Sequence, residues 1–450
     1  MTPTTMSEPG TDAATITAAL HPKAPRTAAE AGLAEDLLVQ LVLKQLFRLG
    51  DLVGTDLART LGLQFSVIEG TLAALRMMHQ VEIVGSAAVG SPSYRYRISD
   101  EGRRRAQLFL DQNQYSGFAP VPLAQYQQYL RAYRVAAPTI STRERVITAF
   151  SHLVLSQRVL DQVGTAAAAG HSLFVYGPPG NGKTVIAQGL GRLLDGEIAI
   201  PHAIEVDGHI VRLFDPVNHE ALTDDAPEDD SLMAPPQRDA RWVRCKRPMV
   251  TVGGELTLNS LDLSYSRDSG VYTPPIQAIS NGGVLVIDDF GRQHCSPRDL
   301  LNRWIVPLES RVDYLTLNNG QKFDLPFLVL VVFATNLKPA DLVDEAFLRR
   351  VQFKVLAESP SYEDFEHIFE NCCRDRNLGY ESAFPRHIFE QYLRPNNITP
   401  RGCHPRDLID QALAYAAYTS RPRALTTDLL DAACASYFVD EAQGIAPSPA

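Results

Sequence analysis

The sequence has no apolar stretch long enough to cross a bilayer. A membrane-spanning helix needs about 20 consecutive apolar residues, and no run in the 450 residues approaches this length. The first thirty residues are rich in Thr, Ala and Pro and lack the basic start and apolar centre of a secretory signal. We therefore predict a cytoplasmic protein without membrane insertion.

Cysteines are few, and their spacing does not favour a metal site. None of the six forms a Cys-x-x-Cys pair, and Cys372 and Cys373 are direct neighbours. Adjacent cysteines are poorly placed to bind one tetrahedral metal ion, so reduced structural thiols are the favoured interpretation.

Positive charge is also scarce. The 42 Lys and Arg residues face 52 Asp and Glu residues, and the formal net charge is -10. A chain of this charge does not favour nucleic acid over its whole surface. The apolar content of 45% is ordinary for a globular protein.

The chain changes character several times along its length. Runs such as SLFVYG, VLVIDDF and FLVLVVFATN are almost continuously apolar, as expected of parallel strands buried on both faces. An acidic stretch at 223–236 is predicted to be a solvated loop. We predict a disordered leader (1–29), a segment with the element order of a winged helix-turn-helix domain (30–111), a connector (112–140), an α/β domain (141–356), a helical domain (357–440) and a tail (441–450).

A phosphate-loop pattern follows the first of these strands. GPPGNGKT fits G-x-x-x-x-G-K-[ST] and precedes a helical segment, VIAQGLGRLL. Its glycines permit a backbone whose amides point at phosphate oxygens. Lys183 would supply charge to the β and γ phosphates, and Thr184 would offer a hydroxyl to Mg²⁺. The pattern predicts an ATP and Mg²⁺ site built from Gly177, Pro178, Pro179, Gly180, Asn181, Gly182, Lys183 and Thr184.

Two adjacent aspartates end a second strand, in VLVIDDFGRQ. Asp288 is predicted beside the Mg²⁺ held by Thr184, mostly through water, which is the Walker B role. Asp289 is then placed to orient or deprotonate the attacking water. An acidic pair exposed to solvent is the alternative.

Four segments, VYGPPGNGKT, VLVIDDF, FATN and DEAFLRR, stand in the order found in AAA+ ATPases. The chain resembles this family from about Ser141 to Asp440. The resemblance implies an α/β fold, in which a P-loop parallel sheet has helices on both faces and is followed by an α-helical lid. It also implies that Asn336 is sensor 1, which would hold the lytic water or the γ-phosphate. A turn after a strand is the alternative for Asn336.

DEAFLRR resembles the segment that carries arginine fingers. Arg349 or Arg350 would then reach the γ-phosphate bound by a neighbouring subunit and stabilise transition-state charge. The alternative is a surface ion pair with Asp344 or Glu345.

The helical domain contains HPRDLIDQA, which resembles the start of a sensor 2 helix. Arg406 would be the lid arginine that contacts the nucleotide. Arg401 is the second candidate, and a capping role is the alternative.

Two features depart from the usual pattern of the family. Most AAA+ ATPases have Asp-Glu where this chain has Asp-Asp. Since Asp289 is one methylene shorter, hydrolysis is expected to be slow or gated by assembly. About a hundred residues separate Thr184 from Val284, more than a compact crossover needs, so we predict an insertion near 205–280. Tyr272 in this insertion could face a central pore or lie half-buried at a hairpin tip.

The winged-helix segment offers a DNA-binding hypothesis that its charges do not favour. In the candidate recognition helix, Gln64–Gln80, the cation Arg76 is opposed by Glu69. A groove-reading helix normally brings several cations and donors. Contacts to phosphates could come from the wing and the next helix through Arg95, Arg97, Arg103, Arg104 and Arg105. Docking of a partner protein is favoured over DNA.

LLNRWIVPLESRVDYL resembles the MoxR-like branch of the family, whose rings remodel protein partners. We therefore predict a homo-oligomeric ring, a hexamer by analogy, that hydrolyses ATP to ADP and phosphate to remodel or assemble a protein client. One alternative is a DNA-directed ATPase or ATP-dependent regulator. Another is a nucleotide-gated scaffold with little hydrolysis, for which Asp289 is the support.

Overall fold

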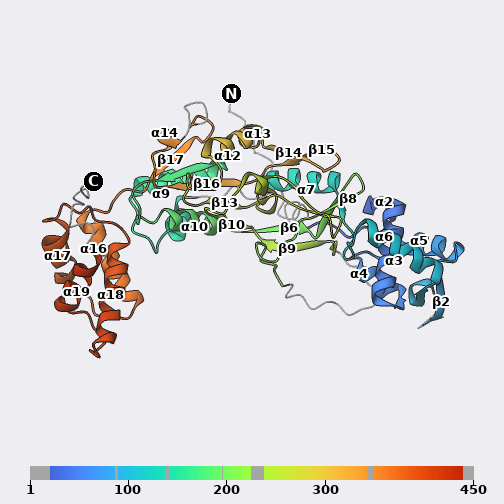
Figure 1. Cartoon of the computed structure of the whole chain (residues 1–450), viewed down its shortest axis with the longest axis horizontal. Coiled ribbons are helices and arrows are strands. Elements are labelled where there is room, and N and C mark those ends of the chain that lie inside the picture. The colour runs from blue at the N-terminus through green and yellow to red at the C-terminus, as the bar shows by residue number, and fades with distance from the viewer. Residues whose placement is uncertain are drawn as a thin grey trace, which may run out of the picture.

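A computed structural model describes residues 21–86, 90–136, 142–194, 196–223, 238–342 and 348–438. Most of the predicted leader, the acidic loop after its first residue, and the whole predicted tail lie outside these residues. Along the longest axis of Figure 1, N-terminal helices, a central α/β and β-rich region, and C-terminal helices follow one another.

The N-terminal unit packs helices against a small antiparallel sheet of order β1-β3-β2. Apolar residues at helical spacing, such as Leu38, Val42 and Leu46, are almost fully buried in its core. The helices and the hairpin expected here are present, and β1 adds a third strand. The elements are α2 (Ala28–Ala31), α3 (Glu35–Leu49), β1 (Leu52–Val53), α4 (Gly54–Thr60), α5 (Phe65–Met77), β2 (Val81–Ser86), the 3₁₀ turn η1 (Ser91–Ser93), β3 (Tyr94–Ile98) and α6 (Asp100–Gln112).

The central unit is an α/β fold with a five-stranded parallel sheet of order β10-β13-β16-β5-β17. The predicted fold class is confirmed. Its strands are β5 (Leu173–Tyr176), β10 (Met249–Val252), β13 (Val284–Ile287), β16 (Leu330–Thr335) and β17 (Phe353–Leu356). Its helices are α8 (Arg143–Ala149), α9 (Gln157–Ala169), α10 (Lys183–Leu193), α11 (Ile276–Ile279), α12 (Pro297–Arg303), α13 (Ile305–Ser310) and α14 (Pro339–Leu342).

Alternate residues of the buried strands face two different cores. Val175 and Val286 pack in the cluster that contains residues of α8, α9 and α10. Phe174, Leu285 and Phe333 pack in the cluster that contains α12 and Trp304. Helices therefore cover both faces of the sheet, which explains why its strands are apolar at every position.

The predicted insertion near 205–280 is partly wrong. It contains β10, which is a strand of the parallel sheet and pairs with β13 from Met249↔Val284 to Val252↔Ile287. Most other strands around it form a β-rich region with its own core. These strands are β6 (Glu197–Pro201), β7 (Ala203–Val206), β8 (His209–Arg212), β9 (Trp242–Lys246), β11 (Ser264–Ser266), β12 (Val271–Thr273), β14 (Val312–Thr316) and β15 (Lys322–Pro326), and the 3₁₀ turn η2 spans Leu258–Leu261.

Tyr272 does not face a pore, nor does it lie half-buried at a hairpin tip. The side chain is 2% exposed on β12, between β11 and β8. Its hydroxyl accepts a hydrogen bond from the Asn318 amide at 3.0 Å. The expected hairpin is present as β11 and β12, but the expectation of a half-buried or pore-facing ring is wrong because neighbouring strands cover it.

The connector is ordered by packing on the β-rich region. It forms β4 (Val121–Pro122), which pairs with β7, and α7 (Leu123–Ala136). Tyr126, Tyr129 and Tyr133 of α7 enter the same core. The Tyr129 hydroxyl accepts a hydrogen bond from the Ala199 amide at 2.7 Å.

The C-terminal unit is helical. Its elements are α16 (Tyr362–Asp375), α17 (Ala383–Ile388), the π-helical turn η3 (Phe389–Leu393), α18 (His404–Tyr418) and α19 (Thr427–Tyr437). Phe365 and Phe369 of α16 are fully buried in its core. In all the described ranges, every helix is too short or too polar to cross a membrane.

Candidate functional site

The phosphate loop joins β5 to α10 with a backbone that requires glycine. Gly177, Gly180 and Gly182 have φ values of 144°, 82° and 73°. At Gly177 a Cβ would lie 2.4 Å from the carbonyl oxygen of Ala357, which follows β17. A side chain there would push the loop away from the sheet edge, so glycine is needed for both conformation and space.

Lys183 is a buried cation that donates hydrogen bonds to the loop itself. Its Nζ donates to the carbonyl oxygens of Gly177 at 3.1 Å and Pro178 at 2.9 Å, and the residue is 8% exposed. Burial lowers the pKa of the Lys183 ammonium, while Asp289 and Asp288 act in the opposite direction. A buried ammonium beside a glycine loop fits a polyanionic ligand such as a triphosphate.

Thr184 and Asp288, which the sequence analysis assigned to Mg²⁺, are in direct contact. The Thr184 hydroxyl at the start of α10 donates to Asp288 Oδ2 at 2.8 Å. Asp288 Oδ1 accepts from the Asp289 amide at 2.9 Å, which fixes the carboxylate at the end of β13. A hydroxyl and a carboxylate beside a phosphate loop form a donor set that suits Mg²⁺, which keeps water and phosphate oxygens as its other ligands.

Asp289 and Asn336 are also brought together. Asn336 follows β16, and its Nδ2 donates to Asp289 Oδ1 at 3.2 Å. Asp289 is exposed to solvent and has a φ of 46°. The second aspartate is therefore turned out of the strand toward Asn336, a contact that the sequence analysis did not predict.

Gln293 is a residue of this site that the sequence analysis missed. Its Nε2 donates to the carbonyl oxygens of Asp288 at 2.9 Å and Asp289 at 3.2 Å. Its Oε1 accepts from the Gly291 amide at 2.8 Å. Gln293 thus closes the turn after β13 with one side chain. It lies inside the quoted stretch VLVIDDFGRQ, but a single glutamine carries no recognisable motif.

The segment before α18 packs directly on the phosphate loop. The Cys403 amide donates to the Gly180 carbonyl oxygen at 2.9 Å, and the Gly402 amide donates to Asn181 Oδ1 at 3.1 Å. A Cβ on Gly180 would lie 2.5 Å from the sulfur of Cys403 and 3.5 Å from Cδ of Arg401. The C-terminal unit therefore contacts the predicted nucleotide site through this segment.

The two sensor 2 candidates have different surroundings. Arg401 lies against the loop at Gly180, as just described. Arg406, the first candidate, is 59% exposed at its side chain and pairs with Asp407 on its own helix at 2.9 Å. In the described residues, Arg401 is therefore the candidate in contact with the phosphate loop.

The candidate arginine fingers lie after a segment that is not described. Asp344 and Glu345, their alternative ion-pair partners, fall outside the described residues. Arg350 pairs with Glu309 at 2.5 Å, and Arg349 is exposed.

Two family profiles match parts of the chain. Residues 151–216, which include the phosphate loop, match magnesium chelatase, subunit ChlI. Residues 361–436, the C-terminal helices, match a domain of unknown function, DUF8689. No curated protein matches the chain.

Distant similarities to solved structures are also found. The RuvB Holliday junction branch migration motor of Thermotoga maritima shares 14% identity, with 64% of this chain and 71% of that chain covered and a TM-score of 0.37. NtrX from Brucella abortus in complex with ADP shares 13% identity, with 75% and 66% covered and a TM-score of 0.37. Both likenesses are too distant to support a functional inference. The ChlI match covers the segment of the central unit that carries β5, the phosphate loop and α10, within a unit built on a five-stranded parallel sheet.

Proposed function

We propose that the protein is an AAA+ ATPase that hydrolyses ATP to ADP and phosphate and remodels or assembles a protein partner. The observation that carries the proposal is the convergence of Thr184 with Asp288 and of Asn336 with Asp289 beside the loop that holds Lys183. Thr184 and Asp288 are 104 positions apart in the sequence, so the fold brings them together.

Each of these side chains has a separate task in the proposed reaction. Lys183 would bind the phosphates, and Thr184 and Asp288 would hold Mg²⁺. The metal ion supplies charge neutralisation on the phosphate oxygens when bound. Asp289 would accept a proton from the attacking water, and Asn336 would keep that carboxylate in position. The hydrogen bond from Asn336 supports this assignment despite the shorter aspartate side chain.

Ring assembly would complete the site. Arg349 and Arg350 follow α14 at a distance in sequence from the phosphate loop, and we infer that at least one acts on nucleotide bound by a neighbouring subunit. The pair between Arg350 and Glu309 would then have to open or be shared on assembly. Hexameric stoichiometry rests on analogy with the family.

The N-terminal unit is better suited to a protein partner than to DNA. Arg97 pairs with Asp51, and Arg104 pairs with Glu101, so part of the expected phosphate-binding charge is used within the unit. Arg105 donates to Gln80 at 3.0 Å. At the end of α5, Met77 is 83% exposed and Met78 is 54% exposed. Exposed methionines suit an adaptable protein contact.

ATP turnover across a series of protein concentrations tests the proposal. We expect specific activity of the wild type to rise with concentration, because the arginines act between subunits. Asp289→Asn should lower kcat by about a hundredfold or more while nucleotide binding persists. The double variant Arg349→Ala/Arg350→Ala should bind nucleotide as the wild type does and should lose the concentration dependence.

Lys183→Ala is the matched control, because it should lose nucleotide binding itself. A wild type that binds MgATP and shows no turnover at any concentration would contradict the ATPase proposal. That result would favour the nucleotide-gated scaffold.

A further inference from the structure

A cavity lies at the amino ends of the strands of the parallel sheet, opposite the end that carries the phosphate loop. It has a volume of ≈ 320 Å³. Gly283 and Leu330, at the amino ends of β13 and β16, form part of its wall, as does His171 just before β5. Since the phosphate loop and the aspartate pair follow the carboxyl ends of β5 and β13, the sheet separates the two places.

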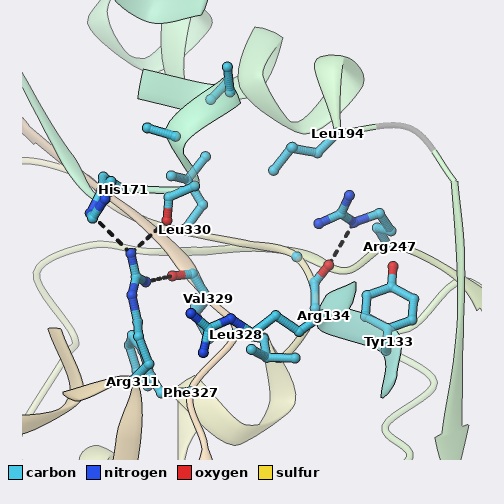
Figure 2. A pocket seen from close by; sticks show the side chains of 16 residues that line it. Tyr133, Arg134, His171, Leu194, Arg247, Arg311, Phe327, Leu328, Val329 and Leu330 are labelled. Carbon is cyan, nitrogen blue, oxygen red and sulfur yellow. Dashed lines mark hydrogen bonds between the residues drawn. The ribbon is translucent and has the colours of Figure 1, made fainter. Parts of the chain in front are cut away.

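Three arginines from separate elements converge on this cavity, as Figure 2 shows. Arg134 comes from α7, Arg247 follows β9, and Arg311 follows α13. In this view Arg311 and His171 lie on one side, and Arg247 and Tyr133 lie on the other. The remaining wall is largely apolar and includes Ala167, Ala168 and Leu194. Among the described residues that line the cavity, none is an aspartate or a glutamate.

Arg311 is anchored by the protein itself. Its Nη2 donates to the Gly170 carbonyl oxygen at 2.7 Å, and its Nη1 donates to the Val329 carbonyl oxygen at 3.4 Å. The first contact places a cation at the C-terminal end of α9, where the helix dipole is negative. Arg311 therefore has a structural role as well as a place in the wall. Burial lowers the pKa of its guanidinium, and the charge of Arg134 acts in the same direction.

The other two arginines bring charge that the described wall does not neutralise. Arg247 donates from Nε to the Gly282 carbonyl oxygen at 2.7 Å. Its guanidinium carbon stands 6.0 Å from the Tyr133 ring centre, so the plane is held over an aromatic face. Fixed guanidinium groups bind phosphate and carboxylate oxygens with paired hydrogen bonds.

We propose that this cavity binds a small anion with two or more negative charges, of the phosphate or polycarboxylate class. The size of the cavity falls in the range of about 300–1,000 Å³ that holds small ligands. Arg134 and Arg247 supply the binding charge, Arg311 fixes the opposite wall, and the apolar residues leave room for a compact organic body. The site is independent of the phosphate loop because the sheet lies between them.

The test is calorimetric titration of the full chain with pyrophosphate and, separately, with citrate at constant ionic strength. The chain carries Lys183→Ala, so that the phosphate loop does not contribute. We expect one site per chain for at least one of the two probes. In this background Arg134→Ala and Arg247→Ala should each weaken binding about tenfold, as expected for loss of a charge-assisted hydrogen bond.

Arg131→Ala is the matched control, since Arg131 is an exposed arginine on the same helix that does not line the cavity. It should leave the affinity unchanged. Binding of pyrophosphate alone would assign a phosphate ligand, and binding of both probes would extend the class to polycarboxylates. The proposal is overturned if neither probe binds, or if Arg134→Ala and Arg131→Ala have the same effect. Arg134 is exposed, so its variant remains informative even if Arg247→Ala fails to fold.

Discussion

Asp289 has a left-handed backbone conformation that few residues other than glycine adopt, with φ at 46°. Such a conformation costs about 1–3 kcal/mol and persists only when its surroundings hold it. Gln293 provides that support through the carbonyl oxygens of Asp288 and Asp289. The carboxylate that we propose as the base is therefore held in position by Gln293.

We predict that Gln293→Ala lowers kcat for ATP about tenfold, the effect expected for a lost hydrogen bond that positions the base. KM should change little, because the phosphate loop is untouched. Steady-state ATPase assays check this split. Gln157→Ala is the control, since Gln157 makes a comparable hydrogen bond to Asp161 on the surface of α9. Equal effects of the two variants would refute the positioning role.

The two arginines before and within α18 give a second prediction at this scale. Arg401→Ala should weaken ATP binding about tenfold, because Arg401 packs against Gly180. Arg406→Ala should have a small effect, since its pair with Asp407 is exposed. Titration with a fluorescent ATP analogue compares them. The reverse order would assign sensor 2 to Arg406, as the sequence first indicated.

At the scale of elements, the start of α18 links the C-terminal unit to the phosphate loop. His404 is fully buried at this helix start. Its Nδ1 accepts a hydrogen bond from the Arg401 amide at 3.3 Å, so the ring must stay neutral to hold that segment. Burial lowers the pKa of His404 to about 4.

This shift predicts a pH dependence of stability. The pKa of His404 in the folded state is below the unfolded value of about 6.5. The neutral ring therefore makes its full contribution to the free energy of unfolding above pH 6.5, and this contribution is lost as the pH falls toward 4. The loss is at most about 3 kcal/mol. The difference in unfolding temperature between the wild type and His404→Leu should shrink as the pH is lowered from 6.5 to 4. His367→Leu, a change at an exposed histidine of α16, should show a constant difference.

At the scale of the whole molecule, a buried ion pair fastens the N-terminal unit to the β-rich region. Arg241 and Asp239 are each 2% exposed and lie 2.8 Å apart. Arg241 Nη1 also donates to the Ala31 carbonyl oxygen at the end of α2, at 3.1 Å. The Arg241 guanidinium contacts Asp239 and Ala31 at the same time. Its planar group has fixed hydrogen-bond directions, so these contacts orient the two units relative to each other.

We predict that Arg241→Ala destabilises the docked structure by about 3–5 kcal/mol, because Asp239 is left buried and unpaired. Scanning calorimetry should show a lower first transition. Asp239→Leu/Arg241→Met should cost less, since no lone charge remains. Arg59→Ala is the control, because the Arg59–Asp56 pair is 75% and 48% exposed and should contribute under about 1 kcal/mol. An Arg241→Ala effect no larger than this would disprove the fastening role.

The sequence by itself determined the phosphate loop, the aspartate pair and the strands that carry them. Each of these features depends on local needs, namely the backbone freedom of glycine, the charge of a lysine or the burial of an apolar strand. Such needs leave a pattern in consecutive residues, so they can be recognised in the sequence. Asn336 was predicted from the resemblance of four ordered segments to AAA+ ATPases. Apolar periodicity predicted the helices and the hairpin of the N-terminal unit.

Only the tertiary structure decided which distant groups meet. The sequence could not show that β10 completes the parallel sheet, that Tyr272 is covered by strands, or that Arg401 rather than Arg406 touches the loop. It gave no sign that Gln293 closes the aspartate turn or that Arg134, Arg247 and Arg311 share a cavity. These relations depend on the packing of separate elements, and packing depends on contacts between residues that are remote along the chain.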